Sequence, residues 1–297
     1  MILLNIISIG KVHVVREDIM SIAKLTSGLT AGEHGILTSS KSASLSYPEG
    51  GNLNCFQLED KSFWFIHRND CIASVIKRFP PGGTVLDVGG GNGFVTKRIL
   101  DEGFDAALLE PGETGALNGK VSRHIPEVIC SPLEDAGFPP SSLSAVGCFD
   151  VIEHIESDHA FLMSVHGLLK SGGILYVTVP AHQWLWSLSD DTAGHYRRYN
   201  KNMVGDLLTS KFEILYFTYF FRVITLPIFF FRTLPFRLHS SRKKKILSSE
   251  SEHGTTGGET VAVFNHFLRK ELAAIQRGKS RQFGSSCLFV ARKISSQ

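Results

Sequence analysis

The 297-residue sequence predicts an α/β fold built on a doubly wound, mostly parallel sheet. Short apolar segments alternate with helical ones between residues 84 and 179, and a Gly-rich turn follows the first of them. The composition, 43% hydrophobic and 20% charged, allows a large core. The handedness of β-α-β crossovers leaves few topologies for such an order. The five expected strands are residues 84–88, 105–110, 127–130, 145–151 and 174–179.

Helical spacing and chain-breaking residues define the segments between these strands. One helix is expected over residues 63–79, before the Pro80-Pro81 stop, and another over residues 94–101. A third should end near Gly172, which suits a helix C-cap.

The two ends of the chain are less regular. Residues 6–15 suit a short strand, whereas residues 27–35 and 39–46 have loop composition. A helix over residues 261–276 and a strand over residues 286–293 are expected to close the chain.

Charge and cysteine content narrow the class of protein. Lys and Arg number 31 against 28 Asp and Glu, and the net charge of +3 predicts no nucleic-acid partner. The five cysteines are odd in number and form no C-x-x-C pair, which favours a reduced, cytoplasmic chain. The apolar start lacks a basic region and a cleavage site, so no signal peptide is expected.

The clearest chemistry lies in V-L-D-V-G-G-G-N-G, residues 85–93. Glycine lets the backbone after a parallel strand approach a ligand closely. A dinucleotide pattern G-x-G-x-x-G beginning at Gly89 would need glycine at position 94, where the chain has Phe94. Asp87, two residues before Gly89, suits a ligand that presents a cationic amino group.

This Asp-x-Gly-x-Gly-x-Gly turn resembles the first motif of the class I S-adenosylmethionine (SAM)-dependent methyltransferases. The resemblance covers about residues 60–220 and the last strand. It implies SAM as cofactor and a seven-stranded Rossmann-like sheet with a reversed last strand, in which residues 211–220 and 285–293 form the final hairpin. Glu110, 19 residues after Gly91, would accept the ribose hydroxyls. Ser131 stands where the family often has an Asp that bonds the adenine. The expected cofactor contacts are Asp87, Gly89, Gly90, Gly91, Gly93, Glu110, Pro111, Ser131, Leu133, Phe149 and Asp150.

Residues 148–155, C-F-D-V-I-E-H-I, resemble the fourth-strand motif of small-molecule O- and C-methyltransferases of the ubiquinone-biosynthesis type. They lack the Asn/Asp-Pro-Pro-Tyr motif of amide- and adenine-directed N-methyltransferases. Glu153, His154 and His159 do not have the H-E-x-x-H spacing, so no metal is expected. His154 either faces the methyl-transfer site or packs under the next loop.

The loop over residues 179–199 follows the fifth strand and should lie on the cofactor side of the sheet. Its motif resembles a methyltransferase subgroup often found with glycan-assembly enzymes, which also carries F-W-F-x-x-R-N, here residues 63–69. His195 with Asp190 is an expected catalytic pair and His154 is its competitor. Alternatively, Asp190, His195 and Arg198 form a brace that shapes the loop. The expected acceptor contacts are Trp186, Arg197, Arg198 and Tyr199.

Residues 212–238 are unusually aromatic but cannot span a bilayer. Their longest uncharged stretch, residues 223–231, is interrupted by Pro227, and a span needs roughly 20 apolar residues. The segment is either a buried helical insertion or oligomer interface, or an interfacial membrane element with the basic residues 242–245 facing anionic head groups.

The expected function is SAM-dependent methylation at an oxygen of a small-molecule, glycan or lipid-linked acceptor. The alternative is a SAM-binding scaffold or regulator without turnover. The expected organisation is an N-terminal extension (1–58), a SAM-binding core (59–220), a hydrophobic and basic helical insertion (221–283) and a final strand (284–297). The expected location is cytoplasmic with peripheral membrane contact, and the oligomeric state stays open.

Overall fold

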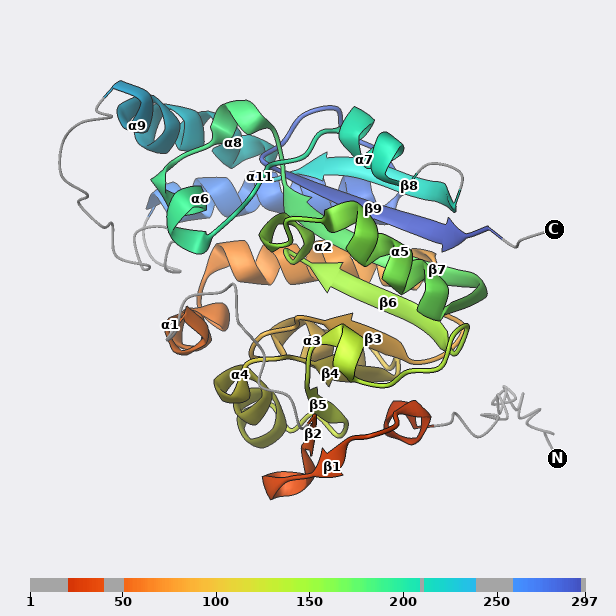
Figure 1. The fold of residues 1–297 in the computed structure, drawn as a ribbon. Helices are drawn as coiled ribbons and strands as arrows, with labels where there is room; N and C mark the ends of the chain where they lie inside the picture. The colour runs from red at the N-terminus through yellow and green to blue at the C-terminus, as the bar shows by residue number, and fades with distance from the viewer. Residues whose placement is uncertain (1–20, 40–50, 209–210, 239–258, 295–297) are drawn as a thin grey trace, which may run out of the picture.

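The computed structural model describes residues 21–39, 51–208, 211–238 and 259–294, and its centre is one nine-stranded sheet. The strand order is β1-β2-β5-β4-β3-β6-β7-β9-β8 (Figure 1). All neighbouring pairs from β2 to β7 are parallel, which confirms the doubly wound class. The strands are β1 Thr30–Ala31, β2 Leu37–Thr38, β3 Val85–Val88, β4 Ala106–Leu109, β5 Val128–Cys130, β6 Leu143–Phe149, β7 Leu169–Pro180, β8 Phe212–Phe220 and β9 Ser286–Lys293.

The far end of the sheet contains the expected reversed strand. β9 lies between β7 and β8 and is antiparallel to both of them. The final hairpin implied by the family resemblance is thereby confirmed, and β3 to β9 take the order that a seven-stranded sheet of this kind requires.

Two short strands extend the sheet beyond the seven expected ones. β2 pairs with β5 in parallel, with Leu37 opposite Ile129, and β1 pairs with β2 in antiparallel. The loop expected at Thr30 and Ala31 is therefore wrong. A two-residue strand shows no alternation in sequence, and here the pairing accompanies burial of Ile36 against the core. The strand expected over residues 6–15 lies outside the described residues.

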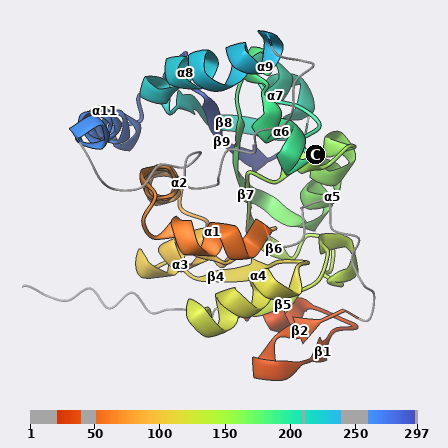
Figure 2. The same cartoon turned by 90° about the vertical axis from the view of Figure 1, so that its left-hand side faces the viewer.

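Helices cover both faces of the sheet and build two hydrophobic clusters (Figures 1 and 2). On one face lie α2, α3 and α11, and on the other α5 and α7. Their bounds are α2 Phe63–Arg78, α3 Phe94–Asp101, α5 Asp158–Leu168, α7 Lys201–Leu208 and α11 Glu259–Gln276. Further helices are α1 Gly51–Glu59, α4 Glu113–Leu117 and α6 Leu188–Ala193.

The start and end of α2 follow from its sequence. The hydroxyl of Ser62 accepts the N–H of Trp64 at 3.2 Å and caps the first turn. Pro80 cannot continue a helix, so α2 ends at Arg78. The helix expected over residues 63–79 is confirmed to within one residue.

The end of α5 differs from the expectation. The helix stops at Leu168, and Gly172 lies inside β7 with a φ of 74°. The reason is Leu169, a fully buried side chain that pairs with Leu143 and takes the chain into the sheet at once. Gly172 therefore forms a bend within the strand instead of a helix cap.

The residues after β8 form an aromatic helical unit, which we define as residues 222–238. It consists of α8 Arg222–Ile228, the short π-helical segment η7 Phe229–Thr233 and α9 Leu234–Leu238. Glu271 on α11 caps α8, because its carboxylate accepts the N–H groups of Phe221 at 2.8 Å and Arg222 at 3.0 Å. None of the helices in the described part of the chain has the length and apolar character that crossing a bilayer requires.

Candidate cofactor and acceptor site

The Gly-rich turn joins β3 to α3 at the carboxyl edge of the sheet, where ligands bind in doubly wound folds. Gly89, Gly91 and Gly93 have φ angles of 66°, 56° and 75°, in the left-handed region that glycine adopts at little cost. A Cβ atom on Gly93 would lie 2.2 Å from Cδ1 of Ile125. The conformation of the turn therefore requires glycine at these positions.

Asp87 lies under this turn with a fully buried side chain. Its Oδ2 accepts the hydroxyl hydrogen of Thr96 at 2.6 Å, whereas its Oδ1 has no hydrogen-bond partner within the described ranges. Burial raises the pKa of Asp87 to about 7, although the hydrogen bond from Thr96 opposes the shift. A buried acceptor that lacks a donor fits a ligand with a cationic amino group, which SAM has.

Glu110 connects the end of β4 to the Gly-rich turn. Its Oε2 accepts the N–H of Gly91 and its Oε1 accepts the N–H of Gly112, both at 2.8 Å. These two backbone N–H groups fix the orientation of the carboxylate at the edge of the turn.

Four further residues expected to contact the cofactor lie at or just after the ends of β4, β5 and β6. Ser131, Leu133 and Phe149 are buried, and Pro111 is half-buried. The hydroxyl of Ser131 donates to the carbonyl of Pro132 at 2.9 Å, a bond within its own loop. Cofactor contact by these four residues stays a prediction.

Sequence reasoning assigned no role to Arg68, which the structure places at the end of β6. Its guanidinium donates to the carboxylate of Asp150 and lies 5.1 Å from the ring centroid of Trp64. Asp150 has a φ of 57° and also accepts the hydroxyl of Thr178 at 3.2 Å. The F-W-F-x-x-R-N element therefore orients an expected cofactor residue. The motif marks Arg68 in the sequence. It does not identify the partner Asp150, which lies 82 residues away along the chain.

A second missed group attaches α1 to the Gly-rich turn. Asn92 of the turn donates to Glu59 of α1 at 3.0 Å, and Arg123 donates to the same carboxylate at 2.8 Å. The Arg123 guanidinium also lies 4.7 Å from the ring centroid of Phe94. No local motif joins these residues, because they come from three separate segments of the chain.

The loop over residues 179–199 is held by a fully buried carboxylate. Asp190 accepts two hydrogen bonds from Arg198, Nε to Oδ1 at 2.7 Å and Nη2 to Oδ2 at 3.0 Å. Its Oδ1 also lies 2.9 Å from Nδ1 of His195, and its Oδ2 accepts the N–H of Ser187 at 2.9 Å to cap α6. Although burial opposes it, the hydrogen bonds from His195 and Arg198 lower the pKa of Asp190.

The brace considered from sequence is thus present. It keeps the Arg198 guanidinium inside the protein, since a third nitrogen donates to the carbonyl of Ala181 at 3.2 Å. His195 is different, because its side chain stays partly exposed while its Nδ1 is occupied by Asp190. The pair of His195 and Asp190 therefore remains compatible with a catalytic role.

The other expected acceptor contacts have different environments. Tyr199 is 1% exposed and donates its hydroxyl hydrogen to Asp158 at 2.8 Å, so the expected acceptor contact conflicts with its place in the core. Arg197 pairs with the same Asp158 at 2.7 Å but keeps partial exposure. Trp186 donates to Asp191 at 2.9 Å and is half-buried. Acceptor contact stays a prediction for Arg197 and Trp186.

Three titratable side chains meet beside this loop. Glu153, His154 and His195 each bring one ligand-type atom within 4.8 Å of the others. The two imidazole rings are 4.7 Å apart between centroids and nearly perpendicular, at 78°. Burial, and next to it Asp150, raises the pKa of Glu153 well above its usual value. Burial, with help from His195, lowers the pKa of His154 to about 4.

The sequence predicted no metal site, but the structure brings together a different set of possible ligands. The sequence offered Glu153, His154 and His159, whose spacing is unsuitable. The structure brings in His195 from the next loop instead, and two imidazoles with a carboxylate form a donor set that divalent transition metals accept.

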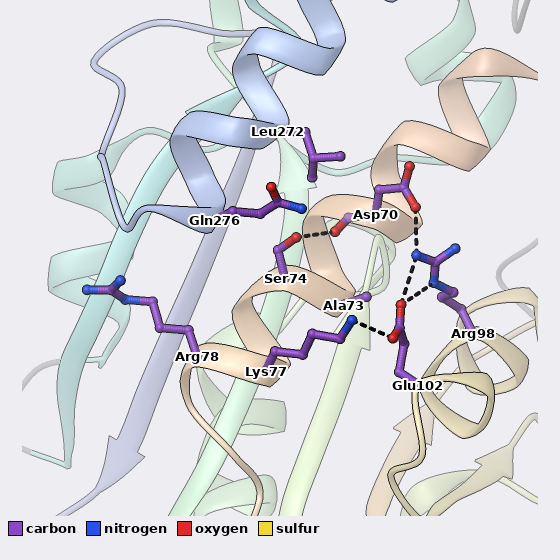
Figure 3. A pocket seen from close by; sticks show the side chains of 9 residues that line it. All are labelled: Asp70, Ala73, Ser74, Lys77, Arg78, Arg98, Glu102, Leu272 and Gln276. Carbon is purple, nitrogen blue, oxygen red and sulfur yellow. Dashed lines mark hydrogen bonds and ion pairs between the residues drawn. The ribbon is translucent and has the colours of Figure 1, made fainter.

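A surface depression of about 480 Å³ lies between α2, α3 and α11, away from the Gly-rich turn (Figure 3). Four of its charged side chains form ion pairs, Lys77 with Glu102 at 2.5 Å and Arg98 with Asp70 at 2.9 Å. The guanidinium of Arg78 lies 5.6 Å from the ring centroid of Phe79 instead. The depression contains no residue that the sequence predicted for the site.

Comparisons with known proteins agree with this arrangement. A family model described as a methyltransferase domain matches residues 64–211. The ubiquinone biosynthesis O-methyltransferase of Xanthomonas campestris pv. campestris is 28% identical over 103 residues, covering 33% of this chain and 43% of that enzyme. A Mycolicibacterium smegmatis protein named "Probable S-adenosylmethionine-dependent methyltransferase" is 25% identical over 161 residues, covering 53% and 62%.

Among solved structures, a chain of the complex with the Haloferax volcanii Trm112 methyltransferase activator is similar, with a TM-score of 0.53 and 15% identity. The match covers 84% of this chain and 97% of that one, and at such identity it shows the fold alone. This chain spans less than two thirds of the length of both curated relatives. The methyltransferase domain, the curated relatives and the shared fold together show that the chain belongs to the class I SAM-dependent methyltransferases.

Proposed function

We propose that this protein transfers the methyl group of SAM to an oxygen of a small-molecule, glycan or lipid-linked acceptor. One observation carries the proposal. The Gly-rich turn with Asp87 and Glu110 lies at the same carboxyl edge of the sheet as the loop that holds His195 against Asp190. The residues proposed to hold the cofactor and the histidine proposed to activate the acceptor therefore lie on the same side of the sheet.

On the cofactor side, SAM supplies a methyl group activated on a sulfonium. Asp87 offers a buried oxygen for the amino group, and Glu110 offers a carboxylate already oriented by two N–H groups for the ribose. Pro111, Ser131 and Leu133 follow β4 and β5 and would flank the adenine.

On the acceptor side, the reaction needs an oxygen held in line with the methyl group, and positioning supplies most of the rate. The new bond forms between the acceptor oxygen and the methyl carbon, and the bond between that carbon and sulfur breaks. The hydroxyl proton is released as the bond forms. His195 is the residue best suited to activate this hydroxyl, because Asp190 fixes its ring through Nδ1. His154, whose pKa is about 4, is a weak base near neutral pH.

The aromatic helical unit supports a membrane-proximal or lipid-linked acceptor. Phe230, Phe231 and Leu238 are exposed by 54%, 78% and 71%. The unit also contacts the candidate acceptor loop directly, since Thr233 donates to the carbonyl of Leu185 at 2.9 Å. An exposed apolar surface that also carries the exposed Arg237 suits peripheral binding to an anionic bilayer. We accordingly propose the unit as part of an insertion, residues 221–283, in a core formed by residues 59–220 and 284–297.

A labelling experiment tests the proposal. Purified protein is incubated with methyl-labelled SAM and a host lysate, with and without its lipid fraction, and both labelled product and S-adenosylhomocysteine are measured. We expect a labelled product whose yield, at a SAM concentration below saturation, is at least several-fold lower in a Glu110→Ala control. Label that appears only with the lipid fraction would identify a lipid-linked acceptor. Saturable SAM binding with no turnover under any condition would instead support the scaffold alternative.

A further inference from the structure

We propose that Glu153, His154 and His195 form a binding site for one divalent first-row transition-metal ion. The first support is an unsatisfied buried group. Glu153 is 1% exposed, and within the described part of the chain its Oε2 has no hydrogen-bond partner. Burying a carboxylate oxygen without a partner is costly, so this oxygen is an acceptor that an added ligand can use.

The second support is geometry. Metal–ligand bonds of about 2.1 Å place the donor atoms of one ion about 3.0 to 4.2 Å apart. The three donor atoms here lie within 4.8 Å of one another, so small side-chain rotations bring them into that range. The nearly perpendicular rings of His154 and His195 allow two nitrogen lone pairs to converge on one point. With three protein ligands, further coordination positions stay open.

The third support is charge. The neighbouring Asp150 is paired with Arg68, and Asp190 is paired with Arg198. Among the described residues Glu153 forms no ion pair, although it lies close enough to Asp150 for that charge to act on it. A divalent cation bound by Glu153 would compensate the charge of its ionised carboxylate, which burial and Asp150 otherwise disfavour.

The fourth support is the orientation of His195. Its Nδ1 lies 2.9 Å from Oδ1 of Asp190, which leaves Nε2 as the nitrogen available to a metal. A metal-binding histidine commonly has such a carboxylate on its second nitrogen, because the hydrogen bond fixes the tautomer and the ring. Asp190 is held by Arg198 and would act as a positioning residue for this ligand.

Binding of the ion is independent of the proposed methyl transfer, but its role rests on that function. A divalent cation would take the acceptor oxygen into an open position and lower the pKa of its hydroxyl. The proton would then pass to solvent water. His195 would activate the acceptor as a metal ligand, because one nitrogen lone pair cannot hold a metal and a proton together.

Metal titrations in the absence of SAM test the site. Chelator-treated full-length protein is titrated with Mn²⁺, followed by the electron paramagnetic resonance of the free ion, and with Co²⁺, followed by its visible absorption. We expect one saturable site per chain. Glu153→Gln should weaken it at least tenfold, and Asp190→Asn should weaken it about 10- to 100-fold through loss of orientation. Added metal should raise the Tm of the wild type more than that of Glu153→Gln.

The matched control is His159→Ala, which removes an exposed histidine outside the cluster and should leave metal affinity unchanged. Circular dichroism checks each variant, and His195→Ala, at a more exposed position, gives the same test if Glu153→Gln does not fold. The site would be overturned if the wild type bound no metal saturably. It would also be overturned if Glu153→Gln and His195→Ala bound the metal as tightly as the wild type. Parallel assays of SAM binding and turnover keep the two proposals separate: metal binding without turnover counts against the methyltransferase activity alone.

Discussion

Nδ1 of His195 lies 2.9 Å from Oδ1 of Asp190, and the same oxygen accepts Nε–H of Arg198 at 2.7 Å. One buried carboxylate therefore orients the imidazole that faces the candidate acceptor site and neutralises the arginine behind it. Asp190 thus has a structural partner in Arg198 and a candidate catalytic partner in His195. Substitutions of Asp190 and of His195 should therefore have different effects.

Removing the carboxylate should mainly reduce stability. Asp190→Ala leaves the Arg198 guanidinium buried without its partner, and breaking a buried pair in this way costs about 3–5 kcal/mol. We expect the free energy of unfolding, measured by urea denaturation, to fall by about that amount. Asp191→Ala is the matched control, because Asp191 is exposed and the one hydrogen bond described for its side chain comes from Trp186. A loss no larger than that of the control would contradict the brace.

Removing the imidazole should reduce turnover instead. We expect His195→Ala to lower kcat by about 10²- to 10⁴-fold, the usual range for a group that assists proton removal. SAM affinity should stay unchanged, since no cofactor contact is expected from this side chain. Methyl transfer and calorimetric SAM binding are measured on the same sample. Full activity in His195→Ala would assign the residue to the brace alone.

The carboxylate of Glu110 should control cofactor affinity. Glu110→Ala removes both acceptors proposed for the ribose and should weaken SAM binding at least tenfold, because hydrogen bonds to a charged group contribute about 1.5–3 kcal/mol. Glu113→Ala, an exposed neighbour at the start of α4, serves as the control. Calorimetric titration measures both variants. Equal affinity in the two would show that the cofactor does not contact Glu110.

Asp87 should make both SAM affinity and stability depend on pH. Its pKa in the folded protein is about 7, above that of an unfolded Asp, so the native state holds a proton that the unfolded chain releases. The resulting stability is present below the unfolded pKa and is lost as pH rises through about 7. SAM needs the ionised form, so its affinity should rise from about pH 5.5 to about pH 7.5.

The control for this pH dependence is Asp87→Asn, which cannot ionise. Its SAM affinity should be weaker and should vary less over the same range, and its unfolding free energy should lack the decrease near pH 7. A wild-type profile that coincides with that of Asp87→Asn would remove Asp87 from the cofactor site.

The aromatic helical unit should bind anionic vesicles. We expect Phe231→Ser to weaken co-sedimentation with such vesicles about tenfold, because burying one phenylalanine contributes about 1.5–3 kcal/mol. The control is Phe267→Ser, which makes the same change at a phenylalanine of α11 that is 49% exposed, against 78% for Phe231. Similar losses in both variants, or none in Phe231→Ser, would contradict a membrane role for this surface. Residues 242–245, the expected basic partner, lie outside the described residues.

Much of the fold could be predicted because its signals are local. The strands from β3 to β7 are short apolar runs between turn residues, and the Gly-rich turn constrains both the backbone and the place of Asp87. The same motif and the position of Glu110, 19 residues after Gly91, indicated the residues expected to hold the cofactor, and contact by these residues stays a prediction.

The rest depends on contacts between distant segments. Arg68 reaches Asp150 across 82 residues, and Tyr199 joins the core because Asp158 satisfies its hydroxyl there. His195 lies far along the chain from Glu153, and only the packing of the loop against the turn after β6 brings the two together. Residue type and spacing cannot determine such contacts.

The loop that carries His195 is attached at both ends to different parts of the molecule. At one end, the N–H of Tyr196 donates to the carbonyl of Glu153 at 2.8 Å. At the other, Thr233 and Arg237 of the aromatic helical unit donate to the carbonyls of Leu185 and Trp184. A displacement of that unit would therefore pull on the Trp184–Leu185 end of the loop, while the backbone of Glu153 holds the segment next to His195 in place.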